Sequence, residues 1–125
     1  MGLDMYAYKT KQKLDKEVDF NVDTDSIEEI AYWRKHPDLH GWMEDLYRNK
    51  GGEDEQFNCS AVKLTAEDLS KLEEDINSRR LPETSGFFFG KSYGDTDEVM
   101  QDLEFIKTAK QAINEGYDIY YTSWW

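Results

Sequence analysis

The clearest structural pattern in the chain is the stretch from 37 to 49, which reads Pro-Asp-Leu-His-Gly-Trp-Met-Glu-Asp-Leu-Tyr-Arg-Asn. Its apolar residues recur three or four positions apart, at Leu39, Trp42, Met43, Leu46 and Tyr47. This spacing places them on one side of a helix. Proline is tolerated at the first helical position, so Pro37 suits the start. The stretch therefore predicts an amphipathic helix whose apolar side packs against another layer.

Strands are predicted on both sides of this helix along the chain. Apolar side chains alternate with others in residues 3–9, 57–64 and 117–124, which is the pattern of a half-buried strand. Residues 86–94 are too short and too rich in glycine for a helix, and they favour a short strand with a turn. Residues 10–24 are charged without helical spacing, so we expect a surface loop or a loose hairpin there.

Three further helices are predicted from start patterns. Ser26-Ile-Glu-Glu29 matches a capping box, in which a serine and a glutamate satisfy the first backbone N–H groups of a helix, and it predicts a helix over about 26–35. Similar starts predict helices over about 65–79 and about 96–115. The expected fold is α+β: a small antiparallel or mixed sheet of about four strands covered by about four helices, in a single domain over residues 1–125.

The charge of the chain limits its partners. Its 125 residues include 27 acidic and 15 basic side chains, for a net charge of −12 at pH 7. Nucleic-acid binding depends on cations that replace phosphate counterions, so we expect no direct nucleic-acid binding. The same charge attracts a protein with a basic groove and speeds the encounter.

Apolar patterning and cysteine content bear on location. No apolar run approaches the roughly 18 residues of a membrane span, so we expect no membrane partner. The single cysteine, Cys59, cannot form an internal disulfide, which favours the cytoplasm. Because Cys59 lies in a predicted strand, we expect a buried, inert thiol.

No motif identifies a reaction. Gly86-Phe-Phe-Phe-Gly-Lys-Ser92 resembles a phosphate-binding loop, but its glycines are separated by three residues instead of four. His36, His40 and Glu44 are four apart, yet no further ligands complete a metal shell, so we expect neither a metal nor a cofactor. A Ser-His-Asp or Cys-His arrangement stays open on composition. We expect no serine in a nucleophile elbow and assign no catalytic residue.

The segment Tyr32-Trp-Arg-Lys-His36 is the densest aromatic and basic cluster in this acidic chain. Tryptophan and arginine often anchor binding sites; the alternative is that Trp33 packs in the core and the basic residues balance Glu28 and Glu29. The candidate binding residues are Trp33, Arg34, Lys35, His36, His40, Trp42, Phe88 and Lys91. Trp124 and Trp125 either tuck into the fold or form an aromatic surface for a homo-oligomer or a partner.

Several segments resemble a family of small uncharacterised proteins of bacteriophages and prophages. They are Met1-Gly-Leu-Asp-Met-Tyr6, Glu29-Ile-Ala-Tyr-Trp-Arg-Lys35, His40-Gly-Trp42, Ser85-Gly-Phe-Phe-Phe-Gly90 and Gln101-Asp-Leu-Glu104. The resemblance follows the same order across most of the chain. It implies a phage gene product in the host cytoplasm and identifies no site. Relatives sometimes carry a phosphoglycerate kinase label, but this chain is too short for a two-domain kinase.

The leading functional hypothesis is a non-enzymatic, acidic phage accessory protein that binds a host macromolecule, for example as a nucleic-acid mimic or anti-defence factor. Exposed aromatics such as Trp33 or Trp42 would anchor the partner. One alternative is a protein that binds or sequesters a small ligand or nucleotide, or an enzyme, using the region of Arg34, His36, His40 and Lys91. Another is a structural component of the virion.

Overall fold

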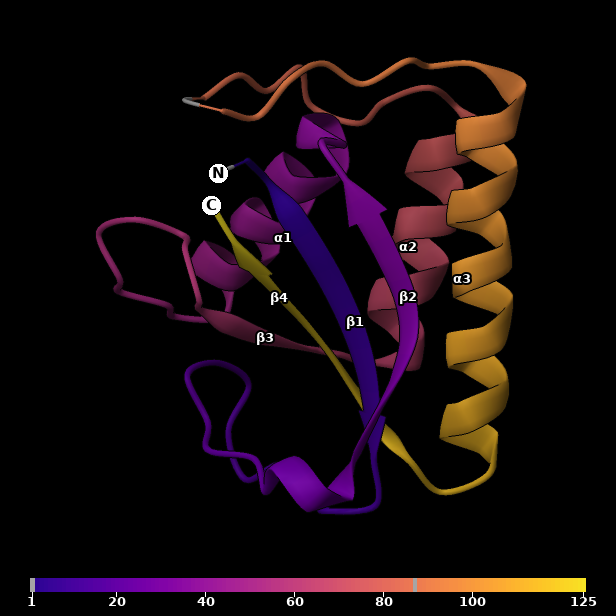
Figure 1. The fold of residues 1–125 in the computed structure, drawn as a ribbon. Coiled ribbons are helices and arrows are strands. Elements are labelled where there is room, and N and C mark those ends of the chain that lie inside the picture. Colours follow the sequence, from indigo (N-terminus) through magenta and orange to yellow (C-terminus); the bar gives the residue numbers. More distant parts are fainter. Residues whose placement is uncertain (1, 87) are drawn as a thin grey trace.

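A four-stranded antiparallel sheet lies at the centre of the computed structural model, which describes residues 2–86 and 88–125 (Figure 1). The strands are β1 (Asp4–Thr10), β2 (Ile27–Arg34), β3 (Ala61–Leu64) and β4 (Asp118–Trp124). Their spatial order is β2-β1-β4-β3, and every neighbouring pair is antiparallel. The first and last strands along the chain thus pair at the middle of the sheet.

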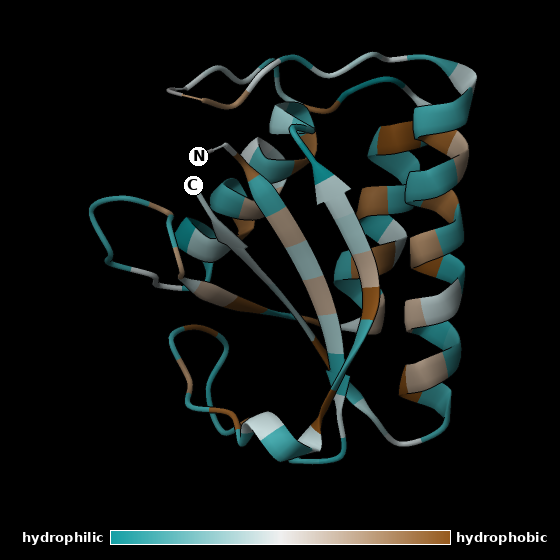
Figure 2. Ribbon diagram, viewed as in Figure 1, coloured by the Kyte–Doolittle hydropathy of each residue, from teal (hydrophilic) through white to brown (hydrophobic). Residues whose placement is uncertain are grey.

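Three α-helices cover one face of this sheet: α1 (Pro37–Asn49), α2 (Ala66–Asn77) and α3 (Thr96–Asn114). One core contains apolar side chains from all three helices and from the strands, including Leu39, Leu72, Phe105, Met5 and Tyr121. Figure 2 shows more and less hydrophobic residues alternating along β1, as expected of a strand with one buried face. The predicted α+β class is confirmed. No helix among the described residues has the length and apolar character to cross a bilayer.

The predicted helix over 26–35 is wrong, because this segment forms a short 3-10 turn, η1 (Thr24–Ser26), followed by β2. Asp23 provides the cap of that turn by accepting the backbone N–H of Asp25. From Ile27 onward the chain pairs with β1 at seven positions. This pairing, together with burial of Trp33, outweighs the local capping pattern. Three α-helices therefore form within the described residues, and the fourth predicted one is a strand.

The predicted strand over 86–94 is also wrong for the residues that the structure describes there. The Phe89 N–H donates to the Gly86 carbonyl at 3.2 Å, which closes a tight turn. Phe88 and Gly90 have φ values of +67° and +71°, which no strand residue adopts. The segment is an irregular loop. Phe87 lies outside the described residues.

The strand predicted over 57–64 is shorter than expected. Residues 57–64 contain only β3, because Cys59 has a φ of +60° and breaks the extended backbone. Its thiol is exposed, so the expectation of a buried cysteine is wrong. The backbone N–H of Cys59 still donates to the Ser123 carbonyl at 2.8 Å and holds the segment beside β4.

Candidate functional site

Two of the candidate residues, Trp33 and Trp42, lie in the core and not on the surface. Their exposed fractions are 2 % and 9 %, so the expectation that they are exposed anchors is wrong. Each indole N–H donates to a buried carboxylate at 2.9 Å, from Trp33 to Asp102 and from Trp42 to Asp75. Satisfying the polar end of the ring inside the fold is what permits this burial.

His40 is buried among aromatic rings. It contacts the rings of Phe57 and Phe89, and its Nδ1 lies 2.7 Å from the hydroxyl of Tyr121. Burial lowers the pKa of His40 to about 4, and the Phe57 backbone opposes this only in part. His40 is therefore neutral near pH 7. Within the described part of the chain, no three His, Cys, Asp or Glu side chains are grouped so that they could hold a metal ion.

His36 lies in a second polar cluster, between a loop and α3. Its Nδ1 is 2.7 Å from Oγ of Ser92, and its Nε2 is 2.9 Å from Oδ2 of Asp102. Oγ of Ser92 also accepts the backbone N–H of Asp38 at 3.0 Å. Glu98 accepts the N–H groups of Tyr93 and Gly94. These bonds connect the loop to the first turns of α1 and α3.

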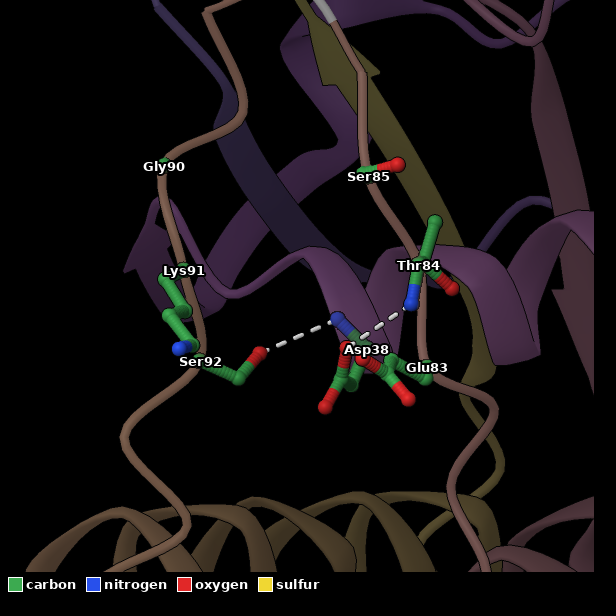
Figure 3. A pocket seen from close by; sticks show the side chains of 7 residues that line it. All are labelled: Asp38, Glu83, Thr84, Ser85, Gly90, Lys91 and Ser92. Carbon is green, nitrogen blue, oxygen red and sulfur yellow. Dashed lines mark hydrogen bonds between the residues drawn. The ribbon is translucent and has the colours of Figure 1, made fainter.

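An open cavity of about 690 Å³ adjoins this cluster. The side chains that line it include Asp38, Glu83, Thr84, Ser85, Lys91 and Ser92. Figure 3 shows Asp38 between two loop segments, bonded to Ser92 on one side and to Thr84 on the other. The cavity combines one lysine with two carboxylates and three hydroxyl groups, so it offers no concentrated positive charge to a phosphate.

Arg34, Lys35 and Phe88 gather near Gly2, where β1 begins and β2 ends. The Arg34 guanidinium donates to Asp4 at 2.9 Å. The Lys35 N–H donates to the Leu3 carbonyl, and the Leu3 N–H donates to the Phe88 carbonyl. The Lys35 stem packs so closely on Gly90 that a Cβ there would lie 2.9 Å from its Cδ. The fold thus distributes the eight candidates over three places instead of one site.

The face of the sheet away from the helices carries a row of aromatic rings. Strand register sets Tyr6 of β1 opposite Tyr32 of β2, and Tyr8 opposite Tyr120 of β4. Ring centroids are 5.3 Å apart for Tyr32 and Tyr6, 6.0 Å for Tyr6 and Tyr8, and 5.3 Å for Tyr8 and Tyr120. Sequence reasoning missed this row. The alternation in residues 3–9 already places Tyr6 and Tyr8 on one face of a strand. Tyr32 could not be added to them, because residues 26–35 were expected to form a helix.

Only part of this face is covered. Leu14 and Phe20, from the predicted loop after β1, pack on Tyr120 and bury it. Beyond them, Tyr32 is 41 % exposed and Trp124 is 68 % exposed. Trp125, in contrast to Trp124, is partly buried, and its indole N–H donates to the Phe57 carbonyl. We call the uncovered part the open face and define it by Asp4, Tyr6, Tyr8, Glu29, Tyr32 and Trp124.

The open face carries two carboxylates, one of them paired with Arg34. Asp4 accepts the Tyr32 hydroxyl at 2.6 Å as well as the Arg34 guanidinium, and the bond from Tyr32 is the main reason that the pKa of Asp4 is lowered. Glu29 is exposed and has no ion-pair partner among the described residues. Burial raises the pKa of Tyr6, and the charges of Asp4 and Glu29 raise it further.

No protein-family model, curated protein or solved structure matches this chain. The candidate sites therefore stand on their own geometry: a buried polar cluster beside a cavity, and an aromatic, acidic sheet face open to solvent.

Proposed function

We propose that this protein binds a basic, extended segment of another protein on the open face. The observation that carries this proposal is the row of tyrosine rings next to the unpaired carboxylate of Glu29. The face of an aromatic ring attracts a lysine or arginine cation. A carboxylate beside the ring adds an ion pair to the same cation, so the two groups together select a positively charged side chain.

The open face already holds one cation through a carboxylate that a tyrosine also contacts. The Arg34 guanidinium bonds to Asp4, and the Tyr32 hydroxyl bonds to the same carboxylate. Glu29, which lies opposite Tyr8, offers a second place with the same two kinds of group. A partner's arginine or lysine fits there without displacing Arg34.

The overall charge supports a basic partner. A net charge of −12 steers cationic surfaces toward the protein and repels the phosphate backbone of nucleic acids. The resemblance to bacteriophage proteins favours a host protein as the partner. In that setting the acidic surface provides the attraction, and Tyr32 and Trp124 take the anchoring role first expected of Trp33 and Trp42.

A peptide of alternating arginine and glycine tests the proposal directly. We expect it to bind the full chain by calorimetry and to change the fluorescence of the exposed Trp124. Raising the salt from about 0.05 M to about 0.5 M should weaken binding by roughly tenfold or more, because salt screens exposed charges. A peptide of alternating glutamate and glycine should not bind.

Matched variants distinguish binding at the open face from attraction by the net charge of the protein. Glu29→Gln and Glu104→Gln each remove one exposed negative charge, but Glu104 is on α3. We expect only Glu29→Gln to weaken the peptide, by roughly threefold. Tyr32→Ala should do the same, with Met100→Ala, 62 % exposed on α3, as its control. Equal effects within either pair, or preference for a single-stranded oligonucleotide over the peptide, would overturn the proposal.

A further inference from the structure

The loop after the Phe-rich segment contains a motif that the sequence reasoning overlooked. Gly90-Lys91-Ser92-Tyr93-Gly94 has the spacing Gly-x-Ser-x-Gly, which in many hydrolases surrounds a nucleophilic serine. Ser92 lies in a loop and not in the usual turn from strand to helix, so the motif alone decides nothing. The contacts of Ser92 decide whether its hydroxyl is set up to react.

One set of hydrogen-bond directions in the cluster is consistent with its fixed donor. The backbone N–H of Asp38 can only donate, so Oγ of Ser92 is its acceptor. The Ser92 proton is then available to Nδ1 of His36 at 2.7 Å. With its own proton on Nε2, His36 donates to the Asp102 carboxylate at 2.9 Å. One consistent assignment thus forms a chain from hydroxyl to imidazole to carboxylate.

The three groups differ in their access to solvent: Asp102 and His36 are buried, and Ser92 reaches the cavity. Asp102 and His36 are 2 % and 3 % exposed, whereas Ser92 lines the cavity of about 690 Å³. The indole N–H of Trp33 also donates to Asp102, which fixes the carboxylate in place. The imidazole is reversed compared with the usual hydrolase arrangement, because the serine meets Nδ1 here. Either ring nitrogen can accept a proton, and such triads are defined by geometry and roles.

We propose that Ser92 is a nucleophile for acyl transfer from small, uncharged esters, independently of the open face. Oγ of Ser92 bonds to the carbonyl carbon of the ester and passes its proton to Nδ1 of His36. The bond to the leaving alcohol breaks as that proton moves to the alcohol oxygen. Water then attacks the acyl-serine with His36 as the base, which releases the carboxylic acid and restores Ser92. Asp102 is a positioning residue that holds His36 and balances its positive charge.

The residues around Ser92 favour a neutral substrate. Asp38 and Glu83 line the same cavity and repel anionic acyl groups. Lys91 lines it as well and provides a positive charge near the oxygen that becomes negative during attack.

A fluorophosphonate probe, which forms a covalent bond with activated serines, tests the proposal on the full chain. We expect mass spectrometry to locate the adduct on Ser92 and not on Ser85, an exposed serine of the same cavity. Ser85→Ala should react like the wild type. The competing role for Ser92 is structural, since its Oγ bonds to the first turn of α1, where His36 makes no side-chain cap. Absence of an adduct on folded wild-type protein would leave only that role and overturn the proposal.

Two further variants test the histidine and the carboxylate. His36→Gln should slow labelling of Ser92 roughly a hundredfold, the usual contribution of a general base. Asp102→Asn should also slow it, and Trp33→Phe, which removes the other bond to Asp102, should slow it less than Asp102→Asn does. Thermal unfolding of each variant, measured alongside, identifies loss of structure. Labelling of Ser92 at the wild-type rate in a folded His36→Gln variant would overturn the proposal.

Discussion

Gly41 is the residue that allows α1 to pack against the segment around Thr84. A Cβ at this position would overlap Oγ1 of Thr84 and lie 3.0 Å from its Cβ. Alanine is the better helix former by about 1 kcal/mol, but the overlap outweighs this gain. We expect Gly41→Ala to reduce the free energy of unfolding by about 1–3 kcal/mol, measured by urea denaturation.

The control is the double variant Gly41→Ala with Thr84→Ala. Removing the threonine hydroxyl and methyl relieves most of the overlap, so the double variant should recover a large part of the loss. Strictly additive effects of the two substitutions would show that the contact does not limit packing.

His40 makes stability depend on pH. Its pKa is lowered from 6.5 to about 4 in the folded protein, so the unfolded chain takes up the proton first as the pH falls. The stabilisation is complete above about pH 6.5 and is lost progressively down to about pH 4. Between pH 7 and pH 5 we expect this group to cost about 2 kcal/mol of unfolding free energy.

The variant His40→Gln isolates this effect, because glutamine can still bond to the Tyr121 hydroxyl but does not titrate. Urea denaturation at pH 7 and pH 5 should show a smaller difference for the variant than for the wild type. An identical difference in both proteins would mean that His40 is not the group responsible.

At the scale of elements, α2 depends on its capping box. The Thr65 hydroxyl accepts the N–H of Asp68 at 3.1 Å, and the Asp68 carboxylate accepts the N–H of Thr65 at 2.9 Å. We expect Thr65→Ala to lower the free energy of unfolding by about 1 kcal/mol, read from chemical denaturation. Thr65→Ser keeps the hydroxyl oxygen and should stay near the wild type, and a loss as large as that of alanine would point to the threonine methyl group instead.

Elements whose formation depends on local spacing could be predicted from the sequence. The apolar positions of α1, from Leu39 to Tyr47, and the start of α2 at Thr65 lie close to the predicted places. β2 could not be predicted in the same way, because its extended form depends on pairing with residues 17 to 30 positions earlier. The loop at Phe88 could not be predicted, because a phenylalanine gives no sign in the sequence of the positive φ that it adopts here.

The candidate sites escaped prediction for the same reason. Ser92 and Asp102 are 56 and 66 positions from His36, and only the packing of α3 beside β2 brings them together. The open face needs Tyr32 of β2 next to Tyr6 of β1, a contact that follows from strand order. The sequence shows which residue types are present, but it does not show which of them lie next to one another in the folded protein.

At the scale of the whole molecule, the excess negative charge opposes folding through mutual repulsion. With a net charge of −12, we expect the melting temperature to rise by a few degrees when sodium chloride increases from about 0.02 M to about 0.3 M, because screening weakens the repulsion. Calorimetric scans at the two salt concentrations measure this. A fall in melting temperature would show that the ion pairs contribute more to stability than the repulsion removes.

The pairing of β1 with β4 has a consequence for how the protein forms in the cell. β1 is synthesised long before its central partner, β4, because residues 11–117 separate the two strands along the chain. Until then, β1 has one neighbour instead of two, and β3 lacks the strand that it pairs with. The sheet is therefore completed only once β4 has been synthesised, and a nascent chain stalled before Asp118 would present unpaired strand edges to chaperones and proteases.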